Sequence, residues 1–197
     1  YKQVSENIIG NYIVEKAVVS IIMKYAYTFQ GIIHRTFKID NCYGTSVLLS
    51  ENLIISVAPN SKIAKVFNIH TGNCTMDLKG HTGDIWSLIC ICDNYVVSGS
   101  DDCTIRIWNV HTGICEKILL GHTDLIETLV ILPNKDLVSG SADNTIRIWN
   151  TTTGECRLVL KGHTDWVRYI GVLNNGQLIS SSGDDTTRIW DTKTGQC

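Results

Sequence analysis

The sequence predicts an all-β fold made of consecutive four-stranded antiparallel units, and three observations support this prediction. One segment recurs at a fixed spacing, and each period contains four short runs of strand-forming residues separated by turn residues. The composition is 44% hydrophobic and 18% charged with two prolines, which is typical of a folded chain and argues against disorder. At 197 residues the chain is long enough to bury a sizeable core.

The strongest signal is a segment that occurs three times at a spacing of 41 residues. It reads SGSDDCTIRIWN at 98–109, SGSADNTIRIWN at 139–150 and SSSGDDTTRIWD at 180–191. A weaker copy keeps the same spacing upstream, with Phe67 in the tryptophan position and Asp40 in the histidine position. Such a period indicates an architecture of repeated structural units.

Within one period the four predicted strands follow in order. The first, DIWSLICI at 84–91, is apolar without alternation, which predicts a strand buried on both faces between neighbouring sheets. The second and third, YVVSGS at 95–100 and TIRIWNV at 104–110, are rich in Val, Ile and Trp. The fourth, CEKILLG at 115–121, follows a Thr-Gly pair whose glycine supplies a positive φ for a tight turn. Equivalent Thr-Gly pairs lie at 71–72, 112–113, 153–154 and 194–195.

The recurring dipeptide Gly-His, the closing Ile-Trp-Asn or Ile-Trp-Asp and the 41-residue length resemble the WD-repeat β-propellers. The resemblance is specific for 80–197, fair for 40–79 and poor before that. It implies a ring of four-stranded blades around a central channel. Each sequence repeat would supply the outer strand of one blade and the three inner strands of the next.

This resemblance predicts that 40–197 form propeller blades, whereas 1–39 form either a degenerate blade or an N-terminal helical segment. Because the last period stops at Cys197 without a fourth strand, we expect an incomplete ring from a fragment of a longer chain. Strands supplied by another copy, or an arc that folds as a stack, are the alternatives. An open strand edge would also favour self-association. The predicted repeats are 40–80, 81–121, 122–162 and 163–197.

The repeated serine, histidine and aspartate could form a catalytic set or a structural one. A hydrolase needs one such set, whereas this chain has three equivalent ones. The resemblance implies a hydrogen-bonded structural tetrad in each blade, and Ser100, Ser141 and Ser182 are alternatives for its serine. The predicted tetrads are His81, Ser98, Asp102 and Trp108; His122, Ser139, Asp143 and Trp149; and His163, Ser180, Asp184 and Trp190.

Other residue patterns favour neither a metal nor a cofactor. Cysteines at 74, 115, 156 and 197 fall in different blades, so they cannot converge on one zinc ion, and we expect free, buried thiols and no metal. Neither the Gly-x-x-x-x-Gly-Lys nor the Gly-x-Gly-x-x-Gly phosphate-binding pattern occurs, and we expect no cofactor. Arg106, Arg147 and Arg188 recur at one strand position, which predicts a solvated face or inter-blade contact.

The overall charge and hydropathy limit the classes of partner that we expect. A formal net charge of −2 gives no support for a nucleic-acid partner. No apolar run reaches the roughly 18 residues of a membrane span, and the first ten residues lack a signal-peptide pattern. We therefore expect no membrane partner and a cytoplasmic location, with the nucleus as the alternative.

Positions that vary between repeats are free to carry recognition. In the family, partners commonly dock on a rim formed by the residues three and five places after the repeat histidine and the one before the tetrad aspartate. Two tryptophans, a tyrosine and an arginine on one rim have the composition of an interaction hot spot. The predicted partner-binding residues are Tyr43, Asp84, Trp86, Asp101, Leu125, Glu127, Trp166 and Arg168.

The resulting functional prediction is a non-catalytic scaffold of the WD-repeat type that binds a partner protein on this rim. A narrower alternative is a substrate-recognition subunit of a ubiquitin ligase complex, although the sequence contains no recognisable F-box. An alternative from another class is a propeller hydrolase, which would need one asymmetric set of catalytic residues.

Overall fold

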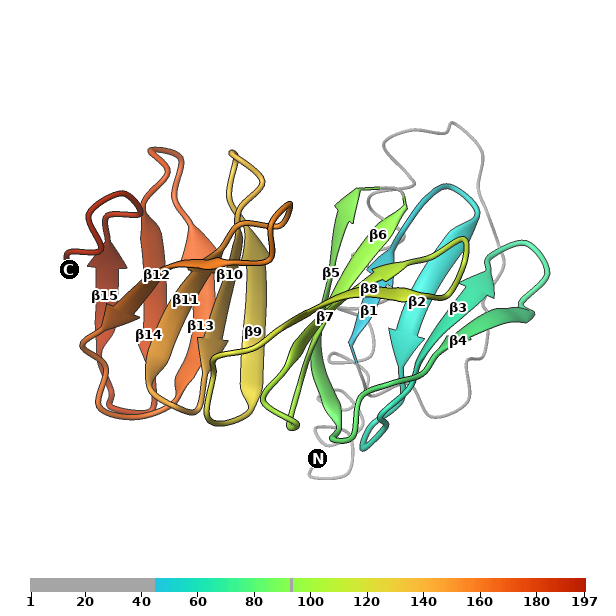
Figure 1. Cartoon of the computed structure of the whole chain (residues 1–197), viewed down its shortest axis with the longest axis horizontal. Coiled ribbons are helices and arrows are strands. Elements are labelled where there is room, and N and C mark those ends of the chain that lie inside the picture. The colour runs from blue at the N-terminus through green and yellow to red at the C-terminus, as the bar shows by residue number, and fades with distance from the viewer. Residues whose placement is uncertain (1–44, 93) are drawn as a thin grey trace, which may run out of the picture.

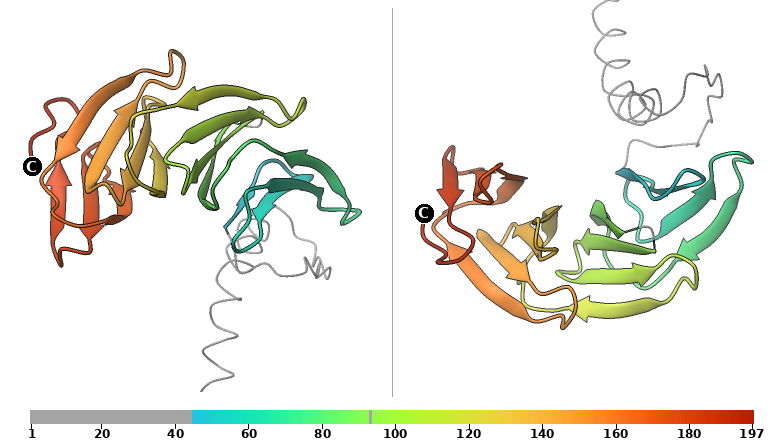
Figure 2. Two further views of the ribbon diagram at one scale, coloured as in Figure 1. Left: turned by 60° about the horizontal axis from the view of Figure 1, so that its bottom comes forward. Right: turned by 90° about the horizontal axis from the view of Figure 1, so that it is seen from above.

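A computed structural model of the 197-residue chain describes residues 45–92 and 94–197. The predictions for 1–39, Asp40 and Tyr43 lie outside these residues. The described part forms four antiparallel sheets, each a meander in which consecutive strands pair (Figure 1). The sheets follow one another along an arc that does not close into a ring (Figure 2). The prediction of an all-β fold of antiparallel blades in an incomplete ring is confirmed.

Three of the sheets have four strands and the fourth sheet has three. In Figure 2 the first strand of each sheet lies on the inner side of the arc, and the fourth strand of the first three sheets lies on the outer side. The strands are β1 (Ser46–Leu48), β2 (Leu53–Val57), β3 (Ala64–Asn68), β4 (Cys74–Leu78), β5 (Ile85–Cys92), β6 (Tyr95–Ser100), β7 (Ile105–Asn109), β8 (Cys115–Leu119), β9 (Ile126–Ile131), β10 (Leu137–Ser141), β11 (Thr145–Trp149), β12 (Cys156–Lys161), β13 (Val167–Val172), β14 (Leu178–Ser182) and β15 (Thr187–Trp190).

The hairpins before the outer strands have the predicted geometry. Gly72, Gly113, Gly154 and Gly195 adopt φ values of 72°, 72°, 82° and 76°. Residues with a Cβ rarely adopt such angles, so glycine is needed there. The prediction that these Thr-Gly pairs make tight turns is confirmed.

Alternation along the strands gives each sheet two faces, and successive sheets pack face to face. In the third sheet Ser139 pairs with Arg147 and Leu137 with Trp149, so these side chains share the face toward the second sheet. Trp149 packs there with Val97, Ile105, Ile107 and Leu119, whereas Val138 and Ile146 of the third sheet pack against Val167 and Trp190 of the fourth. The hydrophobic core is therefore divided into layers, one between each pair of successive sheets.

The prediction that the first strand of each blade is buried on both faces is wrong. Leu88, Leu129 and Ile170 are buried, but the residues that follow each of them are only half-buried. The physical reason is that β5, β9 and β13 are edge strands on the inner side of the arc (Figure 2), so each has a paired strand on one side only and is less enclosed than a central strand.

The first sheet departs from the 41-residue register. Ser56 pairs with Lys65 as Ser98 pairs with Arg106, so the turn between β2 and β3 is one residue longer than its counterpart. Residues of β1 and β2 consequently lie 42 positions before their equivalents in the second sheet.

The part of the chain that the structure describes contains no helix of the length and hydropathy needed to cross a membrane.

Candidate functional site

The repeated polar residues form a continuous hydrogen-bonded chain inside the second, third and fourth sheets. In the third sheet His122 Nδ1 lies 2.7 Å from Asp143 Oδ2, His122 Nε2 lies 2.7 Å from Ser139 Oγ, and Trp149 Nε1 lies 2.8 Å from the same oxygen. An ionised carboxylate only accepts, so Nδ1 carries the imidazole proton and Nε2 accepts from the serine hydroxyl. The same three distances are 2.8, 2.6 and 2.8 Å for His81, Ser98, Asp102 and Trp108, and 2.9, 2.8 and 2.8 Å for His163, Ser180, Asp184 and Trp190.

Threonines complete the shell around each aspartate, and sequence reasoning missed them. Thr145 Oγ1 donates to Asp143 Oδ1 at 2.7 Å, and the Thr123 backbone N–H donates to Oδ2 at 3.1 Å. The signal was present in the sequence, because a threonine follows each repeat histidine and another stands two places after each tetrad aspartate. The equivalents are Thr82 and Thr104 in the second sheet, and Thr164 and Thr186 in the fourth.

These donors determine the protonation of the buried groups. Burial alone would raise the pKa of Asp143, but the hydrogen bonds from His122 and Thr145 outweigh it and hold that pKa well below its usual range. Burial lowers the pKa of His81, and this effect exceeds the raising effect of Asp102. In the second sheet, where hydrogen bonds also hold the pKa of Asp102 below its usual range, the pair is an ionised carboxylate beside a neutral imidazole.

The two serines of each repeat have different contacts. Ser139 Oγ is shared by His122 and Trp149, whereas Ser141 Oγ donates to the Asp124 carbonyl and accepts from the Asp143 backbone N–H. The second serine therefore fastens the turn that follows β10, and only the first touches the tetrad histidine and tryptophan.

The repeated arginines lie against the tetrad tryptophans. Arg147 Cζ is 5.9 Å from the Trp149 ring centre, within the range of a cation–π contact. Its Nε atom is buried and has no hydrogen-bond acceptor among the described residues. A Cβ on Gly121 would lie 2.8 Å from Arg147 Nη1 and 3.3 Å from Trp149 Cη2, so the glycine of Gly-His leaves room for this stack.

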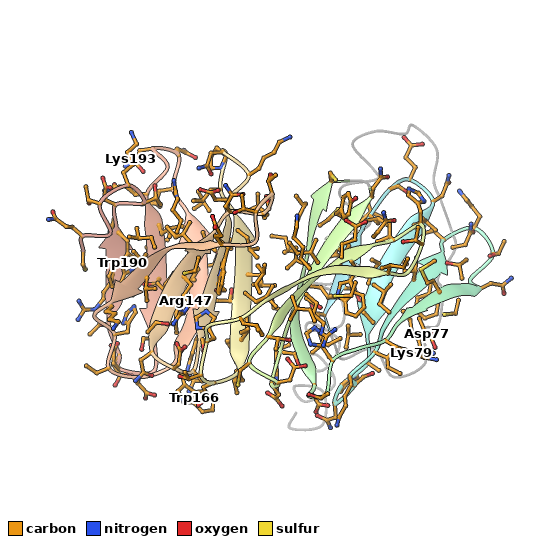
Figure 3. The ribbon with its side chains drawn as sticks, in the orientation of Figure 1. Asp77, Lys79, Arg147, Trp166, Trp190 and Lys193 are labelled. Atoms are coloured by element: carbon orange, nitrogen blue, oxygen red, sulfur yellow. The ribbon has the colours of Figure 1, made fainter. Side chains whose placement is uncertain are left out.

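The predicted partner-binding residues lie at one edge of the arc, which we call the loop rim. Figure 3 shows Trp166 at this edge, while Trp190 lies within its sheet. Trp86 and Trp166 are 48% and 41% exposed, in contrast to 1% for each tetrad tryptophan. In the described residues the loop rim comprises Asp84, Trp86, Asp101, Leu125, Glu127, Trp166 and Arg168.

Charged side chains lie along the loop rim on three successive sheets. Trp86 Nε1 donates to Asp101 Oδ1 at 2.5 Å, and Arg168 Cζ lies 5.6 Å from the Trp166 ring centre. Glu127 lies between these pairs: burial raises its pKa, Arg168 lowers it and Asp101 raises it. Leu125 is half-buried, and its carbonyl accepts from the backbone N–H of residue 142.

The cysteines differ from the prediction of buried thiols. None of the seven described cysteines forms a disulfide, but Cys74, Cys92 and Cys197 are exposed and the others are half-buried. Cys74, Cys115 and Cys156 begin outer strands at an edge of their sheets, so none of the three is fully buried. Among the described residues, no group of three or more His, Cys, Asp or Glu side chains could hold a metal ion.

The fold and the repeated tetrads define the chain as a WD-repeat protein built from propeller blades. The family model described as "WD domain, G-beta repeat" matches residues 72–109, 113–150 and 154–191. Each match begins at a hairpin glycine, includes the outer strand of one sheet and ends after the third strand of the next. The chain belongs to the WD40 repeat family, whose members generally act as non-catalytic interaction domains.

Among solved structures, the WD40 β-propeller domain of Doa1 is similar to this chain. The two are 25% identical with a TM-score of 0.69, and the alignment covers 78% of this chain and 52% of the Doa1 chain. This chain therefore spans about half the length of that structure. No curated protein matches it significantly.

Proposed function

We propose that the chain is a non-catalytic protein-interaction scaffold whose partner binds on the loop rim. One contrast carries this proposal. Residues that repeat at 41-residue spacing are buried in hydrogen-bonded networks, whereas positions that differ between repeats place exposed aromatic and charged side chains on one edge. Hot spots of protein interfaces are rich in tryptophan and arginine, as this rim is.

The buried serines support a scaffold rather than a hydrolase. Ser139, His122 and Asp143 are connected in the order of a catalytic triad, with Ser139 Oγ on His122 Nε2 and Asp143 on Nδ1. However, Ser139 is 0% exposed, and its oxygen also accepts the Trp149 indole N–H. A nucleophile needs an open path to its substrate, and this oxygen is enclosed on all sides.

A fluorophosphonate probe tests the hydrolase alternative directly. We expect no labelling of the folded chain, because the probe must reach a serine oxygen that the core encloses. Labelling that disappears with Ser139→Ala would contradict the scaffold proposal.

Photo-crosslinking tests the place of partner binding. Arg168→benzoylphenylalanine puts the crosslinker on the loop rim, and Lys193→benzoylphenylalanine puts it at the opposite edge of the same sheet (Figure 3). Both residues are exposed cations, so the two variants are matched in charge. In cell extract we expect adducts from the first variant only, competed by excess wild-type chain but not by a chain carrying Glu127→Lys and Trp166→Ala. Equal adducts from both positions would refute the rim proposal.

A further inference from the structure

A small pocket opens on the loop rim between the first and second sheets. Its volume is about 170 Å³, whereas pockets for small-molecule ligands and cofactors are roughly 300–1,000 Å³. The pocket therefore has room for one amino-acid side chain. Sequence reasoning missed it because its walls come from two sheets, one of which departs from the 41-residue register. It is lined by Thr45, Ala58, Pro59, Asn60, Asp84, Ile85 and Trp86.

The walls of this pocket combine an aromatic face with a carboxylate. The Trp86 ring is about half exposed, and its N–H is held by Asp101, which fixes the ring beside the pocket. Within residues 45–92 and 94–197, the Asp84 carboxylate has no hydrogen-bond or ion-pair partner. Asp101 adds a second negative charge at the indole N–H.

The fourth sheet shows what these register positions can hold. Trp166 and Arg168 are the counterparts, 82 residues on, of Asp84 and Trp86. In the fourth sheet the guanidinium stacks on the indole, so one blade supplies both the aromatic ring and the cation. The second sheet has the ring and a carboxylate, and among the described residues no cation lies over Trp86.

We propose that this pocket binds an arginine side chain from the partner protein. The guanidinium stacks on Trp86 and pairs with the Asp84 carboxylate, while its aliphatic stem contacts Ala58 and Pro59. Arginine fits better than lysine because a planar guanidinium can stack and bond a carboxylate at once. The inference rests on the proposed function and assigns the partner a basic segment.

The field around the pocket favours a cation. Two carboxylates lie beside the Trp86 ring: Asp84 lines the pocket, and Asp101 accepts the indole N–H. A negative field of this kind attracts a basic segment to the rim before the side chain enters the pocket. The loop rim also has a positive charge, Arg168, but it lies on the fourth sheet, where its guanidinium is over the Trp166 ring.

Two peptides of the same shape test the proposal on the whole chain. One is Gly-Gly-Arg-Gly-Gly with blocked ends, and the other has neutral citrulline in place of arginine. The probe is the indole N–H resonance of Trp86 in ¹H–¹⁵N spectra at low salt, assigned with Trp86→Phe. We expect the arginine peptide to shift this resonance saturably and to bind about fivefold or more tightly than the citrulline peptide, because citrulline has neither ion pair nor cation–π contact.

A matched pair of variants locates the effect. Asp84→Asn removes the pocket carboxylate and should weaken arginine binding about threefold, which is typical for an exposed ion pair. Asp185→Asn removes an exposed carboxylate from the β14–β15 turn, at the same edge of the fourth sheet as Trp166, and should change binding by less than about 1.5-fold. The indole resonances of Trp108, Trp149 and Trp190 verify that each variant is folded.

The outcomes separate this inference from the proposed function. Three results would overturn the arginine pocket. They are equal affinity for the arginine and citrulline peptides, equal weakening of arginine binding by Asp84→Asn and Asp185→Asn, and a phosphoserine peptide that shifts the Trp86 resonance when the arginine peptide does not. If Arg168 crosslinking persists in that case, the rim proposal stands. Arginine binding at Trp86 without crosslinking from the rim would overturn the partner-binding role while the pocket stands.

Discussion

Replacing Ser139 with alanine removes one oxygen atom from the interior of the third sheet. That oxygen accepts the Trp149 indole N–H at 2.8 Å and lies 2.7 Å from His122 Nε2. Ser139 is 0% exposed and Trp149 is 1% exposed, so water cannot replace the lost hydroxyl without local opening. Ser139→Ala therefore leaves a buried donor, the Trp149 indole N–H, and a buried acceptor, His122 Nε2, without a hydrogen-bond partner.

The expected cost follows from these two groups. Each buried polar group left without a partner costs about 1–3 kcal/mol. Because alanine is close to serine in size, a cavity contributes little. We expect the free energy of unfolding to fall by about 2–6 kcal/mol, which is a large part of the stability of a domain.

Urea unfolding followed by far-UV circular dichroism measures this loss. The variants Trp149→Phe and Ser139→Ala/Trp149→Phe complete a double-mutant cycle, since phenylalanine removes the indole N–H that loses its acceptor in Ser139→Ala. We expect Trp149→Phe to cost about 1 kcal/mol less in the alanine background than in the wild-type chain. A loss below about 0.5 kcal/mol for Ser139→Ala, or no coupling in the cycle, would refute a bracing role for this serine.

Two further predictions concern acid and packing. The free energy of unfolding should decline below about pH 6.5, because His81 binds a proton more readily in the unfolded chain than in the folded one. It should decline again below about pH 3.8, because Asp102 is protonated in the unfolded chain at a higher pH than in the folded one. Thermal unfolding from pH 8 to pH 3 measures both declines, and higher stability at pH 5 than at pH 7.5 would contradict them. Gly121→Ala should lower the free energy of unfolding in urea by about 1–3 kcal/mol, because the added Cβ would clash with Arg147 and Trp149. An unchanged urea midpoint would contradict this prediction and show that the two side chains move aside without cost.

Sequence alone predicted the features that depend on local chemistry and repetition. Strand-forming runs separated by Thr-Gly turns predicted four-stranded sheets, and the positive φ of Gly113 is that of the predicted hairpin. The 41-residue spacing also indicated that one set of side chains, exemplified by His122 and Ser139, would recur in equivalent surroundings. Repetition carries this information because equivalent residues occupy equivalent places in each sheet.

Features that depend on two neighbouring sheets could not be predicted in this way. The longer turn between β2 and β3 shifts the first sheet by one residue, so the register upstream of Pro59 could not be read from the later repeats. The rim pocket joins Pro59 to Trp86 across an inter-sheet boundary, and no spacing within one repeat relates them. The stack of Arg147 on Trp149 is a similar case, because a repeated arginine is equally compatible with a solvated face.

Hydrogen exchange of the five tryptophan indoles tests the central claim most directly. The claim is that the repeated polar residues brace the interior, while positions that differ between repeats face the partner. After transfer to D₂O, the indole N–H signals of Trp108, Trp149 and Trp190 should persist about 100-fold longer than those of Trp86 and Trp166, because each buried N–H is bonded to a serine oxygen. Exchange of any of those three as fast as that of Trp86 or Trp166 would contradict the account.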